Sequence, residues 1–129
     1  MVYAIHWEDG GIRTVWTGRV TSGQILEFQR AVQSDARFDD ICYSLHDFRG
    51  CTEVAYSRDD MFEAAAIDRA GSLSNPREIR IAVVAGDPKV VEMIKSYLDA
   101  EESPYPLRFF GGMDDAEQWV RAPVGRHIR

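Results

Sequence analysis

The chain begins with two runs rich in β-branched and aromatic residues, separated by a short polar segment. The runs cover residues 2–7 and 12–20, and the segment between them reads Glu-Asp-Gly-Gly. Two such runs around a tight polar connection predict a β-hairpin. Side chains alternate between the two faces of a strand, so Ile12 and Trp16 fall on one face of the second run and Arg13 falls on the other.

A helical pattern follows the hairpin directly. Thr21, with Gln24 three residues later, forms a capping-box pattern that predicts a helix N-terminus. Ile25, Phe28 and Val32 then recur at the spacing of one helix face. We therefore expect an amphipathic helix that packs against the sheet through this stripe.

Three further strands are predicted at residues 41–48, 79–85 and 107–110, each an apolar run bounded by polar or glycine residues. Ser57 is a predicted N-cap for the helix after the first of these strands. Asp87, followed by a proline, is a predicted N-cap for the helix after the second. Strand and helix therefore alternate through this part of the chain.

A last helix is predicted from Asp114, after two glycines turn the chain. The order of elements is then β-β-α-β-α-β-α-β-α. This order predicts an α/β fold with one mostly parallel five-stranded sheet and four helices, joined by right-handed crossovers. We expect one domain over residues 1–122 and a short basic tail over residues 123–129.

Composition narrows the function classes. The chain has 129 residues, of which 45% are hydrophobic and 28% charged, with a formal net charge of -6. This acidic balance disfavours nucleic-acid binding, which depends on Lys and Arg neutralising phosphates. The apolar runs are far shorter than the roughly 20 residues of a membrane-spanning helix. No export signal is visible at the N-terminus, so we expect a cytoplasmic protein without stable membrane insertion.

The sequence predicts no cofactor and no metal site. Cys42 and Cys51 lack the spacing of a zinc site, and the three histidines lack any metal-ligand pattern. Both cysteines are expected to be free thiols in a reducing compartment, with Cys51 in a loop. Adjacent His46 and Asp47 point to opposite faces of a strand, so they do not form an acid–base pair. Nothing in the sequence indicates an enzyme.

Several short segments combine with this order of elements to indicate a family. They are residues 18–21 (GRVT), 45–48 (LHDF), 80–84 (RIAVV) with 86–87 (GD), and 109–110 (FF) ahead of 116–119 (AEQW). Together they resemble the SpoIIAA-like, or STAS-like, small α/β domains over nearly the whole chain. The resemblance implies a regulatory or protein-interaction module. It also implies a fold similar to lipid-carrying domains of the Sec14 type, whose members bind apolar ligands.

The best understood STAS relatives, the anti-sigma-factor antagonists, bind a partner kinase that phosphorylates a serine or threonine. That residue directly precedes a glycine and shortly follows an aspartate. Asp47 and Gly50 match this frame, but Arg49 occupies the position of the phosphorylated residue. The chain therefore departs from the family's switch. Thr52 and Ser57 are the nearest hydroxyl groups, and Ser57 is also explained as a helix cap.

The carboxyl edge of the predicted sheet is the candidate binding site, because ligands and partners of open parallel sheets gather there. One predicted loop carries Asp47, Arg49, Gly50 and Thr52, and the next carries Asp87. We expect a polar docking patch in which Arg49 can pair bidentately with a carboxylate or phosphate. The alternative is that Asp87 only caps a helix and Arg49 is only a solvated charge.

Three function hypotheses follow. The leading one is a non-enzymatic regulatory module of the STAS-like type that binds another protein. The alternative is a small-molecule or lipid-binding domain with an apolar cavity beneath a helix, and an enzyme is the least favoured. The many aromatic residues also leave open a homodimer that pairs through the edge of the hairpin.

Overall fold

The structure is a computed structural model that describes residues 2–123. Its five strands form one sheet in the order β1-β2-β3-β4-β5. Only β1 and β2 pair antiparallel, and every other neighbouring pair is parallel. The strands are β1 (Tyr3–Glu8), β2 (Gly11–Thr21), β3 (Tyr43–Ala55), β4 (Arg80–Val84) and β5 (Leu107–Phe110). The α/β fold class and the order of elements predicted from the sequence are confirmed. Most of the predicted basic tail, residues 124–129, lies outside the described part.

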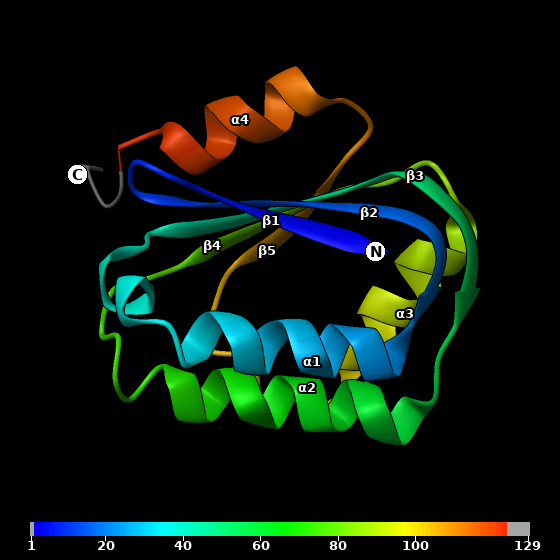
Figure 1. The fold of residues 1–129 in the computed structure, drawn as a ribbon, viewed down its shortest axis with the longest axis horizontal. Helices are drawn as coiled ribbons and strands as arrows, with labels where there is room; N and C mark the ends of the chain where they lie inside the picture. Colours follow the sequence, from blue (N-terminus) through cyan, green and yellow to red (C-terminus); the bar gives the residue numbers. More distant parts are fainter. Residues whose placement is uncertain (1, 124–129) are drawn as a thin grey trace.

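Helices cover both faces of the sheet. Three of them, α1, α2 and α3, lie on one face, and α4 lies alone on the other (Figure 1). Each β-α-β crossover moves one strand along the sheet in the same direction, so right-handed connections place the first three helices on a common face. The helices are α1 (Ser22–Gln33), α2 (Arg58–Gly71), α3 (Pro88–Asp99) and α4 (Met113–Arg121), with a short 3-10 helix, η1 (Ala36–Asp40), that the sequence did not predict.

The predicted helix caps are present. Thr21 and Gln24 form the reciprocal capping box at the start of α1. The Ser57 side chain accepts a hydrogen bond from the backbone N–H of Asp60, and the Asp87 side chain accepts one from that of Lys89. These bonds satisfy backbone donors that have no partner within the helix. They fix where α1, α2 and α3 begin, at the carboxyl end of the sheet.

Strand β3 is longer than the sequence predicted. It was expected to end at Phe48, but it continues to Ala55. Its pairing with β4 stops at Asp47, whereas its pairing with β2 continues as far as Thr21 opposite Ala55. The two strands therefore leave the sheet as a two-stranded ribbon that bends toward the first turns of α1 and α2 (Figure 1). The polar sequence of this ribbon reflects its exposure to solvent.

The sheet separates two hydrophobic clusters. The larger one lies beneath α1, α2 and α3, and the smaller one lies beneath α4. Trp16 is fully buried in the larger cluster and stacks on Phe48, with ring centroids 5.4 Å apart. Leu45 and Ala116 are fully buried in the smaller cluster. No helix within the described residues is long and apolar enough to cross a membrane.

Candidate functional site

The structure brings Asp47 and Arg49 of the predicted site together. The Arg49 guanidinium donates to both carboxylate oxygens of Asp47, at 2.9 and 3.0 Å. Burial opposes ionisation of Asp47, but the side-chain and backbone hydrogen bonds from Arg49 hold its pKa below the usual value. The bidentate geometry predicted for Arg49 is thus already met by a carboxylate of the same strand.

The other predicted site residues are spread over the same end of the molecule. Arg49, Gly50 and Thr52 were predicted to lie in a loop, and this was wrong, because all three belong to β3. Gly50 and Thr52 are exposed on the ribbon. Ser57 and Asp87 cap α2 and α3. The structure therefore assigns local roles to the caps, and it does not gather all six residues into one pocket.

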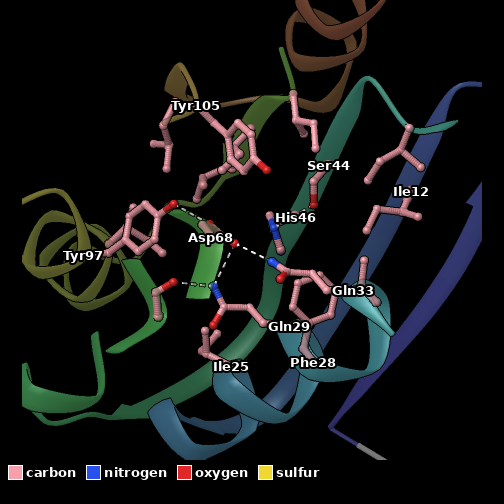
Figure 2. A pocket seen from close by; sticks show the side chains of 18 of the residues that line it. Ile12, Ile25, Phe28, Gln29, Gln33, Ser44, His46, Asp68, Tyr97 and Tyr105 are labelled. Carbon is pink, nitrogen blue, oxygen red and sulfur yellow. Dashed lines mark hydrogen bonds between the residues drawn. The ribbon is translucent and has the colours of Figure 1, made fainter. Parts of the chain in front are cut away.

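A cavity of about 80 Å³ lies on the other side of β3, between the sheet and α1, α2 and α3 (Figure 2). Its walls are mostly aliphatic and aromatic, with Ile12, Phe28 and Ile94 among them. Polar side chains reach it from the same elements and from the segment ahead of β5. They are Gln29, Gln33, Ser44, His46, Asp68, Tyr97 and Tyr105. The cavity is large enough for several water molecules or one small organic molecule.

His46 is held as a neutral imidazole. The Trp16 indole N–H donates to its Nδ1 at 3.1 Å, and an indole nitrogen is only ever a donor. Nδ1 must therefore carry the lone pair and Nε2 the proton. Nε2 lies 3.1 Å from Ser44 Oγ, so it donates to that oxygen. Burial lowers the pKa of His46 to about 4, which favours the same neutral form.

Asp68 of α2 forms a buried polar cluster at the cavity. Its Oδ1 accepts hydrogen bonds from Gln29 Nε2 and Gln33 Nε2, both at 3.1 Å, and its Oδ2 accepts one from the Tyr97 hydroxyl (Figure 2). Burial raises the pKa of Asp68 to about 6, although these three hydrogen bonds oppose the rise. Burial and the Asp68 carboxylate also raise the pKa of Tyr97. All three donors are neutral groups.

Two polar atoms that line the cavity have no partner within the described residues, the Tyr105 hydroxyl and Gln29 Oε1. Tyr105 is 8% exposed, and Figure 2 shows its hydroxyl pointing across the cavity toward the strand that carries Ser44 and His46. Gln29 uses its Nε2 for Asp68 and for the Ala64 carbonyl, which fixes its oxygen toward Ile25. Buried polar groups without partners cost free energy, so they mark where another molecule can bind.

No cluster of three or more His, Cys, Asp or Glu side chains that could hold a metal ion occurs in residues 2–123. Cys42 and Cys51 are free thiols. The sheet directs His46 toward the cavity and Asp47 toward Arg49, so the two neighbours point to opposite faces as predicted.

The sequence interpretation missed the polar lining of the cavity. One signal was available in the helices: Gln29 lies four residues after Ile25 and therefore belongs to the buried stripe of α1. Asp68 likewise lies four residues after the fully buried Ala64 of α2. A polar residue within the apolar stripe of a helix indicates a buried polar side chain. No comparable signal exists for Tyr105, because it lies outside any predicted element.

Comparison with solved structures identifies the fold. The unphosphorylated form of the anti-sigma factor antagonist SpoIIAA superposes with a TM-score of 0.59 over 94% of this chain and 99% of that chain, at 6% sequence identity. The chain has a SpoIIAA-like fold. An uncharacterized DUF3478-family protein from Shewanella loihica PV-4, described with the same fold, superposes with a TM-score of 0.52 at 19% identity. That match covers 92% of this chain and 93% of the other.

No protein-family model and no curated protein sequence matches the chain. The SpoIIAA-like fold predicted from the sequence is confirmed. Sequence identities of 6% and 19% carry the fold and nothing finer.

Proposed function

We propose that this chain is a non-enzymatic binding module of the STAS type that takes up a small, largely apolar molecule in the cavity beneath α1, α2 and α3. The cavity itself carries the proposal. Its apolar walls favour a molecule that loses hydrophobic surface to the protein, and its few polar groups give that molecule one orientation. The SpoIIAA-like fold supports a binding role over a catalytic one.

Native mass spectrometry of the chain, purified gently from its own host, tests this function. We expect a bound mass that is lost on denaturation, together with a higher melting temperature than that of the ligand-free chain. A clean ligand-free mass, with no thermal shift across a panel of small apolar compounds, would contradict the proposal.

Two matched substitutions localise the binding. Ala64 and Ala116 are both fully buried helical alanines, but Ala64 lines the cavity and Ala116 packs on the opposite face of the sheet. Ala64→Val places two methyl groups toward the cavity, so we expect it to abolish the bound mass. Ala116→Val is the control and retains it. Loss of the mass in both variants would place the ligand elsewhere.

A protein partner at the carboxyl edge of the sheet is the second candidate function. Its support is the likeness to SpoIIAA, which is described as an anti-sigma factor antagonist, together with the exposed side of the Asp47–Arg49 pair. Co-purification at low salt tests it, with Arg49→Ala expected to release the partner and Arg30→Ala, an exposed arginine of α1, expected to retain it. Recovery of the chain alone would contradict this candidate. A phosphorylation-switched version predicts phosphate on Thr52 or Ser57.

A further inference from the structure

The side of the cavity formed by β3 offers a hydrogen-bond donor that has no acceptor among the described residues. Ser44 Oγ accepts from His46 Nε2, because the Trp16 indole has fixed the imidazole proton on that nitrogen. An oxygen that accepts this bond keeps its own hydrogen free. Ser44 is 8% exposed and lines the cavity, so that hydrogen is largely shielded from bulk water. The Ser44 O–H is therefore available to a molecule inside.

A second unused donor faces it. The Tyr105 hydroxyl is buried, has no partner within the described residues and points across the cavity toward β3 (Figure 2). Burial, with a contribution from Asp68, raises the pKa of Tyr105 to about 12. The phenol therefore keeps its proton at neutral pH and acts as a donor. Two donors, one on β3 and one on the segment ahead of β5, thus lie at the same small cavity.

The charges around the cavity restrict what those donors can receive. Asp68 is the one carboxylate among the lining residues, and no Lys or Arg is among them. An anionic head group would meet the Asp68 carboxylate and find no cation to offset its desolvation. An ammonium group beside Ser44 and Tyr105 would meet two further donors. The acceptors of the lining are less available to it, because Asp68 already accepts three hydrogen bonds and the Gln29 oxygen is directed toward Ile25. An uncharged oxygen fits both constraints.

Resting on the proposed function, we infer that the ligand of this cavity carries an uncharged oxygen, as in a ketone, aldehyde, ester or alcohol, which accepts hydrogen bonds from Ser44 and Tyr105. The cavity volume of about 80 Å³ limits the size of the enclosed part. A cavity of about 150 Å³ holds benzene. We therefore expect the enclosed part to have fewer non-hydrogen atoms than the six of benzene, either as a whole molecule or as the end of a longer one.

Three probes of similar shape test the inference on the full chain, by titration followed in two-dimensional amide NMR spectra. Butan-2-one supplies the carbonyl oxygen, 2-methylbut-1-ene replaces that oxygen with a CH₂ group, and propanoate replaces a methyl group with the second oxygen of an anionic carboxylate. We expect Tyr105→Phe and Ser44→Ala each to weaken butan-2-one binding about fivefold, which is the loss of one hydrogen bond. Both variants should bind 2-methylbut-1-ene as the unsubstituted chain does. The anion should not bind.

Tyr43→Phe is the matched control, because it removes a tyrosine hydroxyl that bonds to Glu8 on the opposite face of the sheet. It should leave both affinities unchanged. Ketone affinities within twofold of the original in both cavity variants would overturn the inference, as would an anion that binds as well as the ketone. A crystal structure with saturating ketone that shows only water on Ser44 and Tyr105 would also overturn it. Failure of every probe to bind would instead contradict the cavity function itself.

Discussion

The polar side chains on the two faces of the sheet differ in how completely they are paired. Beneath α4, Arg13 bonds to Glu8 at 3.0 Å and to Glu117 at 2.5 Å, and Arg121 and the Tyr43 hydroxyl also donate to Glu8. Burial would raise the pKa of Glu8, but hydrogen bonds from Tyr43 and Arg13 lower it overall. Glu8, Arg13 and Glu117 therefore each have an oppositely charged partner.

Beneath α1, α2 and α3 the polar groups are less completely paired. Asp68 has three neutral donors and no cation, His46 is held neutral, and Tyr105 has no partner within the described residues. This face is also less tightly packed, because the cavity lies on it. Unpaired polar groups next to empty volume are costly for a structural core and useful for a binding site. The difference between the faces therefore supports the proposed binding site under α1, α2 and α3.

The largest expected effect concerns the two titratable groups of the cavity face, whose contributions to stability oppose each other. Asp68 has a pKa near 6 in the folded chain, above its usual value, so its contribution is lost as pH rises from about 4 to 6. His46 has a pKa near 4, below its usual value, so its contribution is lost as pH falls from about 6.5 to 4. Each difference corresponds to about 3 kcal/mol, and the two nearly cancel.

Substituting either group should reveal the pH dependence of stability that the other group contributes. With Asp68→Asn, the free energy of unfolding should rise by about 3 kcal/mol, relative to the original chain, between pH 4 and 6.5. With His46→Gln it should fall by about the same amount over this range. Urea unfolding at a series of pH values measures both slopes. The double variant is the control and should match the pH profile of the original chain. If both single variants kept the pH profile of the original chain, the contributions of Asp68 and His46 would not oppose each other.

The second prediction compares packing on the two faces through the alanine pair. Ala116→Val adds two methyl groups to a fully buried position with no adjoining cavity, so we expect a loss of about 2 kcal/mol from overpacking. Ala64→Val adds the same groups beside the cavity, and we expect a loss below about 1 kcal/mol, mostly from the lower helix propensity of valine. Thermal or urea unfolding measures both. Equal losses would mean that the cavity walls are as tightly packed as the α4 face.

Local signals explain what the sequence predicted well. The starts of α1, α2 and α3 depend on Thr21, Ser57 and Asp87, each of which bonds to a backbone N–H two or three residues away. The alternation of strands and helices is also a local pattern, so the parallel topology followed from the order of elements. These features require no knowledge of distant contacts, and they were correct.

Long-range contacts explain what the sequence did not predict. The end of β3 is determined by its pairing with β2. No pattern within residues 49–55 predicts this pairing. The donor chain of the cavity joins Trp16, His46 and Ser44 from two strands, and the Asp68 cluster joins three helices. The predicted site residues were chosen from the edge of the sheet. The cavity could be anticipated as an alternative hypothesis, but its polar residues could not be named.

The smallest expected effects compare one polar deletion on each face. Arg13→Gln removes a half-buried cation that bonds to Glu8 and Glu117, and we expect a loss of about 1 kcal/mol that shrinks in 1 M salt. Tyr105→Phe removes a buried hydroxyl that has no partner in the described chain, and we expect stability to be unchanged or raised by up to about 1 kcal/mol at any salt concentration. Urea unfolding at low and high salt measures both. A salt-independent loss of more than about 1 kcal/mol in Tyr105→Phe would mean that this hydroxyl already has a hydrogen-bond partner in the ligand-free chain. The two faces would then not differ in the pairing of their buried polar groups at Tyr105.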